Sequence, residues 1–218
     1  MLNGKRRNTR GPRTDPRPTE MPMGRLPEWI IADTHFGHDN IIRYSRRPQD
    51  HDALMIANWK AQVKASDIVL HLGDVYFKNP ELVARAKLPG QIYFLRGNHD
   101  RGRAVDVLRD LGWRLVEPFS HQLGKWRIVF THWPLEDLSA NTINVHGHTH
   151  TLPERGARYL SLSVEHWDYR PQPLLTRLQE RIAVLDNPER RAEHERARQE
   201  AWVVADRERG LEDARLDI

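Results

Sequence analysis

Five short β-type runs in this sequence each end in side chains that can bind a metal ion, and this repetition constrains the fold more than any other feature. The runs lead into Asp33-Thr34-His35, Gly73-Asp74, Gly97-Asn98-His99-Asp100, Thr131-His132 and Gly147-His148-Thr149-His150. In α/β sheets ligands gather in the crevice beyond the carboxyl ends of the strands, so residues distant in sequence converge there. Glycines let the backbone turn sharply beside such a site. The pattern therefore predicts a metal site at one rim of a sheet.

The segments around these blocks alternate β-rich runs with helical patterns, which is typical of an α/β domain. The expected strands cover residues 29–32, 68–70, 91–95, 114–117, 120–123, 126–131, 142–145 and 159–164. The expected helices cover residues 51–65, 80–87, 102–111, 173–185 and 188–210. We accordingly divide the chain into a basic arm (1–25), a domain large enough for an enzyme (26–186) and a charged helical tail (187–218).

The tail carries oppositely charged residues at helical spacing, which suits a solvated helix face. The expected pairs are Arg191 with Glu195 and Arg196 with Glu200. We expect this helix to pack on the domain, or to pair with another subunit, through Trp202, Val203 and Val204.

Positive charge is concentrated at the N-terminus. Residues 1–25 contain seven basic and two acidic side chains, a net charge of +5, whereas the whole chain carries +4 and the remainder therefore −1. A globally basic nucleic-acid-binding face is not supported, but the arm could hold nucleic acid through counterion release. Its Pro, Gly and Arg content predicts disorder. Met21 and Met23 leave open that translation starts there.

The composition limits both the location and the kind of metal site. The sequence contains no run of the roughly 20 apolar residues that a membrane span needs, and its polar, arginine-rich start is unlike a secretory signal. We therefore expect a cytoplasmic protein without membrane contact. Cysteine is absent, so a metal ion would be held by imidazole, carboxylate, amide or water ligands.

The five blocks resemble the signature of the calcineurin-like metallophosphoesterase superfamily, over residues 29 to about 167. The resemblance implies an α/β fold of two mixed β-sheets packed face to face and flanked by α-helices, here followed by a charged C-terminal helix. It also implies two metal ions: one held by Asp33, His35 and His150, the other by Asn98, His132 and His148, with Asp74 bridging both.

The ligand chemistry is consistent with that allocation. Two divalent ions about 3.5–4 Å apart need an anion between them, which a carboxylate such as Asp74 and a hydroxide supply. Oxygen ligands mixed with imidazoles favour Mn, Fe, Zn, Co or Ni over an all-oxygen Mg or Ca site. The choice among these ions stays open.

We expect the chain to hydrolyse phosphate esters by attack of the metal-bridging hydroxide on phosphorus. His99 is the candidate general acid for the leaving alkoxide, and Asp100 would orient it and favour its protonated form. Phosphodiesters are slightly favoured over monoesters, although a phosphatase or a nuclease would use the same seven ligands. A non-catalytic scaffold is disfavoured because no ligand is substituted.

Several neighbours of the motif residues have two interpretations each. His38 could contact the substrate phosphate, or it could simply lie at the surface. Arg96 could also contact the phosphate, or it could form a structural ion pair. His71 and His146 precede ligands inside strands, so hydrogen bonding to ligands or core packing is preferred over direct ligation.

Aromatic and amide side chains also adjoin the motifs and could support a base or a leaving group. Core packing is the preferred interpretation for each of them. They are Asn40, Tyr76, Phe77 and Trp133.

Overall fold

The structure is a computed structural model that describes residues 21 and 25–216, with side chains described as far as residue 208. The predictions for the basic arm therefore lie almost entirely outside the described residues. In the described part of the chain, no helix is long and apolar enough to cross a membrane.

The first sheet contains five strands in the order β4-β3-β2-β1-β9, of which β1 to β4 run parallel. These strands are β1 (Trp29–Ile31), β2 (Ile68–His71), β3 (Gln91–Phe94), β4 (Arg114–Leu115) and β9 (Gln172–Pro173). Parallel neighbours need crossover connections, and the helices α2 (His51–Gln62), α3 (Pro80–Ala86) and α4 (Arg103–Asp110) supply them. The short strand β9 pairs antiparallel with β1 at the other edge.

The second sheet contains four strands in the order β5-β6-β7-β8. They are β5 (Phe119–Leu123), β6 (Trp126–Phe130), β7 (Thr142–His146) and β8 (Tyr159–Ser161). β5 and β6 form an antiparallel hairpin, and β6, β7 and β8 run parallel. Both sheets are therefore mixed, as predicted. The chain ends in two helices, α5 (Leu174–Leu185) and α6 (Pro188–Leu216).

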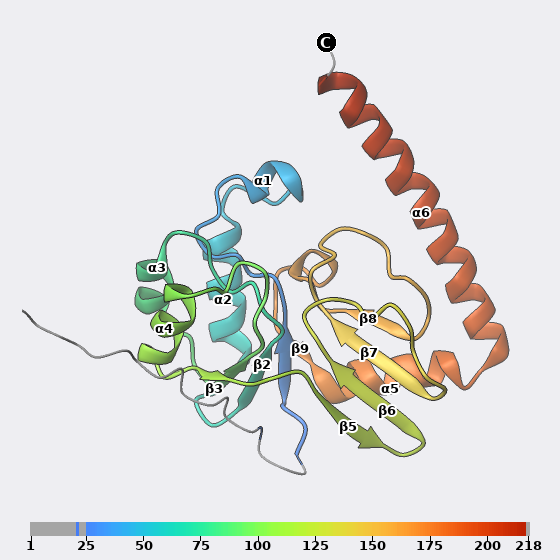
Figure 1. Ribbon diagram of the computed structural model, residues 1–218, viewed down its shortest axis with the longest axis horizontal. Coiled ribbons are helices and arrows are strands. Elements are labelled where there is room, and N and C mark those ends of the chain that lie inside the picture. The colour runs from blue at the N-terminus through green and yellow to red at the C-terminus, as the bar shows by residue number, and fades with distance from the viewer. Residues whose placement is uncertain (1–20, 22–24, 217–218) are drawn as a thin grey trace, which may run out of the picture.

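Alternating side chains on the strands build two cores. In β2 and β3, Leu70 and Tyr93 point into the core between the sheets, where they join Ile128 and Val145 of the second sheet. Their neighbours, such as Phe94, point into a second core under α2 and α4. Successive side chains of a strand face opposite sides, so a strand with apolar residues at every position is covered on both faces. Figure 1 shows α2, α3 and α4 beside the first sheet and α6 beyond β8 on the far side.

The two sheets meet at one point, just beyond β1 and β8. Ala32 forms a parallel bridge with Ser163, and its N–H donates to the carbonyl of Leu162 at 2.9 Å. The carboxyl ends of strands from both sheets therefore lie at a common rim.

The eight strands expected from the sequence are all present; five are shorter than predicted, and β2, β5 and β7 are each one residue longer. Three short elements were not predicted: α1 (Ile41–Tyr44), the 3-10 turn η1 (Val164–His166) and β9. None of them is long enough to display a periodic apolar pattern. The last helix continues to residue 216, beyond its predicted end at 210.

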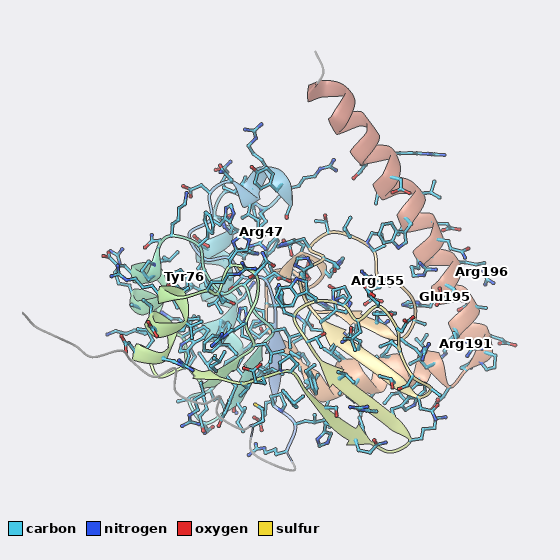
Figure 2. The ribbon with its side chains drawn as sticks, in the orientation of Figure 1. Arg47, Tyr76, Arg155, Arg191, Glu195 and Arg196 are labelled. Atoms are coloured by element: carbon cyan, nitrogen blue, oxygen red, sulfur yellow. The ribbon has the colours of Figure 1, made fainter. Side chains whose placement is uncertain are left out.

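Helix α6 is anchored through its first half. The carboxylate of Glu195 accepts the Ala157 N–H at 2.9 Å and pairs with Arg198 at 2.7 Å, and the Trp202 indole donates to the Glu154 carbonyl at 3.2 Å. Figure 2 shows Glu195 at this part of the helix. The predicted contact of Trp202 with the domain is confirmed. Packing of Val203 and Val204 on the domain is wrong, because 51% and 53% of these side chains are exposed, whereas their pairing with another subunit stays a prediction. The predicted partner of Glu195 was Arg191, whereas its carboxylate bonds to Arg198 and Ala157 instead.

Candidate metal centre

The candidate ligands sit at strained turns directly after the strands. Five of them have a left-handed backbone, with φ of +57° at Asp33, +47° at His35, +57° at Asp74, +71° at His148 and +48° at His150. This conformation costs a side-chain-bearing residue about 1–2 kcal/mol. Such strain is concentrated at functional sites, and here it occurs repeatedly along one rim of the molecule.

Two glycines allow the loops after β2 and β3 to touch. A Cβ atom on Gly73 would lie 2.6 Å from the Gly97 nitrogen, and one on Gly97 would lie 2.1 Å from Oδ1 of Asp74. Both distances are too short for any other residue. The glycines thus bring the Asp74 carboxylate against the loop that carries Asn98 and His99.

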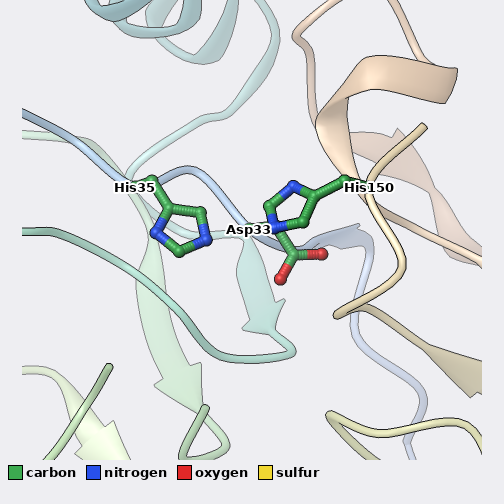
Figure 3. A group of neighbouring side chains, drawn as sticks. All are labelled: Asp33, His35 and His150. Atoms are coloured by element: carbon green, nitrogen blue, oxygen red, sulfur yellow. The ribbon is translucent and has the colours of Figure 1, made fainter. Parts of the chain in front are cut away.

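Asp33, His35 and His150 form a first group of donors. One ligand atom from each lies within 4.8 Å of the others, and Figure 3 shows the two imidazole rings on either side of the carboxylate. Asp33 Oδ2 accepts hydrogen bonds from the His148 N–H at 2.8 Å and the Ser163 hydroxyl at 2.6 Å. Asp33 Oδ1 and both ring nitrogens of His35 are buried without a hydrogen-bond partner. Such orphaned atoms are costly to bury, and a divalent cation among them would satisfy them.

A second group consists of Asp74, His132 and His148, whose ligand atoms also lie within 4.8 Å of one another. The Asn98 amide oxygen lies 3.1 Å from Nε2 of His132 and 3.0 Å from Nδ1 of His148. Nδ1 of His132 lies 2.9 Å from the Leu72 carbonyl, an acceptor, and so carries a proton. Nε2 of His132 thus faces the Asn98 amide oxygen and lies 3.5 Å from Oδ2 of Asp74, so one cation could be held among these three donors.

Asp74 lies between the two groups. Its Oδ2 is 3.4 Å from Nε2 of His35 and 3.5 Å from Nε2 of His132. Burial disfavours the charged carboxylate, but the hydrogen bond and charge of His132 and the charge of His35 outweigh it, so the pKa of Asp74 is held well below its usual range. Burial raises the pKa of Asp33, partly opposed by His150 and His132.

His99 opens the cluster to solvent. Its ring centroid lies 5.1 Å from that of His35, and its backbone N–H donates to Asp74 Oδ1 at 2.8 Å. The side chain itself is exposed. This position leaves the ring able to approach a bound ester from outside, and its role as general acid stays a prediction.

Asp100 does not have the predicted position beside the His99 ring. It is fully buried, and its carboxylate accepts the backbone N–H groups of Asp74 at 2.6 Å, Val75 at 3.1 Å and Gly97 at 3.0 Å. Burial and the charge of Asp74 raise the pKa of Asp100 to about 6, against these bonds. Asp100 therefore fixes the loops that carry Asp74 and Asn98, and the prediction that it orients His99 is corrected.

A buried ion pair supports the first group and was missed in the sequence. Arg47 donates to the carbonyls of Asp33 at 2.6 Å and Thr34 at 2.7 Å, and it bonds to Glu165 at 2.6 Å. Glu165 in turn lies 2.9 Å from Nδ1 of His150. Burial opposes ionisation of Glu165, but His150 and Arg47 lower its pKa to about 2. Figure 2 shows Arg47 near the centre of the molecule, above β1 in this view. A single arginine and a single glutamate in separate loops give no sequence pattern that could have revealed the pair.

The remaining predicted neighbours differ in how close they lie to the cluster. His38 is half-buried, 5.7 Å from the His35 ring and stacked on Phe77 at 4.2 Å between centroids. Arg96 is exposed after β3, and its contact with phosphate stays a prediction.

Tyr76 is buried at 6% exposure, as expected for core packing. Trp133 is 46% exposed, so the core-packing interpretation is wrong for Trp133. Asn40 is exposed at the start of α1.

The two strand histidines make hydrogen bonds rather than joining either ligand group. His71 accepts the Gly73 N–H at Nδ1 and lies 2.9 Å from the Thr34 hydroxyl at Nε2, and burial lowers its pKa to about 3. His146 donates to the Gly147 carbonyl at 2.8 Å, and burial lowers its pKa to about 4. Both side chains are fully buried, which agrees with the core-packing alternative; neither bonds directly to a candidate ligand side chain.

Comparison with known proteins gives one family, together with relatives of known sequence and of known structure. The sequence profile described as "Calcineurin-like phosphoesterase" matches residues 26–202. The uncharacterized protein MJ1445 of Methanocaldococcus jannaschii is 32% identical, over 67% of this chain and 86% of that protein. Among solved structures, the protein of unknown function AQ665 from Aquifex aeolicus is 25% identical with a TM-score of 0.54, over 66% of this chain and 92% of its own. A structure described as a novel archaeal phosphodiesterase is 21% identical with a TM-score of 0.38, over 64% of this chain and 85% of its own.

Proposed function

Because the chain belongs to the calcineurin-like phosphoesterase family, we propose that it hydrolyses phosphate esters, phosphodiesters in preference to monoesters, at a pair of divalent metal ions. The observation that carries the proposal is the meeting of two His/Asp groups from separate strand ends, with Asp74 within 3.5 Å of a ring nitrogen in each. Phosphate monoesters and nucleic acid stay alternative substrates, because the same side chains would serve them.

The residues divide naturally between two ions. Asp33, His35 and His150 would hold the first, and Asn98, His132 and His148 the second, with Asp74 shared. The orphaned Oδ1 of Asp33 and the unpaired ring of His35 support this assignment. Mixed imidazole and oxygen donors suit Mn, Fe, Zn, Ni or Co. When bound, such ions supply Lewis-acid activation of water and charge compensation on the phosphoryl oxygens.

The chain's own side chains supply proton transfer and positioning. His99 stands at the exposed side of the cluster, where its ring can donate a proton to the leaving alkoxide. His38, held by its stack on Phe77, is placed to contact a phosphoryl oxygen. The exposed sides of His99 and His148 leave room for ester groups on both sides of one phosphorus, which favours diesters.

Parallel assays with two chromogenic substrates test the proposal. Metal-stripped protein would be given Mn, Zn, Ni or Mg separately, and hydrolysis of bis(4-nitrophenyl) phosphate and 4-nitrophenyl phosphate followed side by side. We expect turnover only with added metal, and faster with the diester. Bound metal would be counted independently by elemental analysis.

Asp74→Asn is the decisive variant. It keeps the size of the side chain but removes the charge shared by both ion sites, so we expect turnover to fall by at least about 100-fold and the metal content to drop. Asp110→Asn, the same change at an exposed position ending α4, is the matched control and should behave as wild type. Full activity in stripped protein, or equal activity in the two variants, would contradict the proposal.

A further inference from the structure

Two large aromatic side chains are exposed in the described part of the chain, and both border the candidate metal centre. They are Tyr44, which is 76% exposed, and Trp133, which is 46% exposed. Every other described Phe, Tyr or Trp is buried or half-buried. Exposing such apolar area is unfavourable unless a ligand covers it, so their common location at the site points to ligand contact.

Trp133 is held against the second ligand group. Its ring lies 4.7 Å from that of His132 and 5.9 Å from that of His148. The Thr131 hydroxyl donates to the Trp133 carbonyl at 2.6 Å, which fixes the backbone at this turn. The indole therefore offers a fixed, exposed surface beside the position expected for the phosphoryl group.

Tyr44 reaches the site from α1. It lines a cavity of 590 Å³ together with His148, His150 and polar groups of the loop that follows them, such as Thr149 and Thr151. This volume falls within the range of about 300–1,000 Å³ found for small-molecule sites. An aromatic ring above a polar floor suits a planar ligand that also makes hydrogen bonds.

Helix α6 closes the outer side of the same cavity. Ala205 and Glu208 line it, and Glu208 pairs with Arg46 of the segment after α1 at 2.9 Å. Both side chains of this pair are about half exposed, at 58% for Arg46 and 49% for Glu208. The helix therefore limits the width of the cavity beside Tyr44. A cavity limited in this way suits a single nucleotide or a short single strand better than a duplex.

We propose that the esters hydrolysed here carry nucleosides, whose bases stack on Tyr44 and Trp133 on either side of the reacting phosphate. Stacking on aromatic rings accepts any base, so the proposal names nucleoside phosphodiesters as a class and no particular base. It rests on the proposed function, because the phosphate must be bound at the metal centre for the bases to reach the two rings.

Two diesters with the same leaving group isolate the contribution of the nucleoside. Thymidine 5′-(4-nitrophenyl phosphate) and methyl 4-nitrophenyl phosphate both release nitrophenol, and they differ only in the group that stays on phosphorus. We expect the metal-loaded, full-length protein to prefer the thymidine ester in kcat/KM by at least about 10-fold. If neither ester is hydrolysed with any metal, the proposed function fails; if both are hydrolysed equally well, only the present inference fails.

Variants of the two rings provide the second arm. Tyr44→Ala or Trp133→Ala should reduce the thymidine-to-methyl preference by about 5-fold or more, mainly through KM for the thymidine ester, whereas Tyr44→Phe and Trp133→Phe should retain most of it. Leu111→Ala, which removes another exposed apolar side chain that does not line the cavity, is the control and should leave the preference unchanged. An unchanged preference in both alanine variants would overturn the inference.

Binding provides a readout that does not depend on turnover. Calorimetric titration of the metal-loaded protein with thymidine 5′-monophosphate should give a Kd that rises at least about 5-fold in one of the alanine variants. Absent binding, or equal Kd values in wild type and both alanine variants, would also overturn the assignment of Tyr44 and Trp133.

Discussion

Single residues at the rim combine backbone strain with incomplete hydrogen bonding. Asp33 and His35 both have positive φ, and both are buried with unpaired polar atoms. Neither feature stabilises the fold by itself, since each costs free energy. Their coincidence on the same two residues indicates that the rest of the structure holds the donors in place for a cation.

Gly97 is the residue whose substitution tests this arrangement most directly. In Gly97→Ala the new Cβ would overlap Oδ1 of Asp74, which lies 2.1 Å from its position. We expect the Asp74 carboxylate to be displaced, metal affinity to fall by at least about 10-fold, and stability to drop by roughly 1–3 kcal/mol. Calorimetric metal titration and urea unfolding measure the two effects.

Gly112→Ala is the control for that substitution: its Cβ would meet no atom within 4 Å, and an alanine there is strained only by the φ of +86°, which Gly97 does not share. It should lose stability and keep its metal affinity. Equal metal affinities in the two variants would show that the contact between Gly97 and Asp74 is not what positions the carboxylate.

His99 makes a second residue-scale prediction. If its ring protonates the leaving group, His99→Ala should slow esters with alkyl leaving groups by about 100-fold or more, and nitrophenyl esters far less, because nitrophenolate leaves without a proton. Rates on methyl and nitrophenyl diesters measure this directly. Equal losses on both esters would remove His99 from the role of acid.

The sequence identifies the ligands at this scale but not the residues that hold them. The seven candidate ligands stand next to predicted strand ends, so their convergence follows from the topology of the sheets. Arg47, Glu165 and Ser163 reach the site through loops without a regular pattern, and they become visible only when the chain is folded. Asp100 was noticed for its place beside His99, but its main-chain contacts depend on how two loops meet.

At the scale of elements, one half-buried carboxylate joins the loop after β7 to both C-terminal helices. Glu154 pairs with Arg181 of α5 at 2.7 Å, lies 3.6 Å from His194 of α6, and accepts the Ser161 N–H at 3.0 Å. Burial raises its pKa, but His194 and Arg181 outweigh burial and lower it to about 2. The docking of α5 and α6 on the second sheet therefore depends on a charged Glu154.

This pairing predicts how stability depends on pH. The pKa of Glu154 is lower in the folded protein than its ordinary value of 4.5, so its contribution is complete above about pH 4.5 and disappears as the pH falls toward about 2. Glu154→Gln should cost roughly 2–3 kcal/mol at pH 7 and progressively less below pH 4.5. Urea unfolding at pH 7, 5, 4 and 3 measures the difference.

Glu189→Gln, at an exposed position in the first turn of α6, is the control for the same change of charge. Its unfolding free energy should follow that of wild type at each pH. A constant difference between Glu154→Gln and wild type across the pH range would show that ionisation of Glu154 does not stabilise the helices.

The predictability of the elements follows their length and the number of faces that they bury. β2 and β3 are apolar on both faces because one side meets the other sheet and the other side meets helices, so their strands stand out in the sequence. The two-residue strand β9 has no such pattern, and its second residue, Pro173, was assigned to the start of a helix. For α6, charge spacing predicted a helix, but only the fold shows that Trp202 reaches the domain and Val204 does not.

At the scale of the whole molecule, the candidate metal centre joins the two sheets. Asp33, His35, Asp74 and Asn98 follow strands of the first sheet, whereas His132, His148 and His150 follow strands of the second. Direct links between the sheets at this rim include the bridge between Ala32 and Ser163 and the hydrogen bond from the His148 N–H to Asp33. Ions bound here would cross-link the halves of the molecule, and would bind the folded chain in preference to the unfolded one.

Metal binding should therefore raise the unfolding temperature of the whole protein. An ion present at 100 times its Kd stabilises the folded state by about 2.7 kcal/mol, which corresponds to roughly 5–10 °C for a chain of this size. Calorimetric scans of stripped protein with increasing Mn or Zn measure the shift. Asp33→Asn removes a charge from the first group and should lose most of the shift, whereas Asp110→Asn should retain it. A single unfolding transition whose temperature rises with metal concentration would show that the ions hold both sheets together. A rise of the same size in Asp33→Asn and wild type would place the bound metal elsewhere.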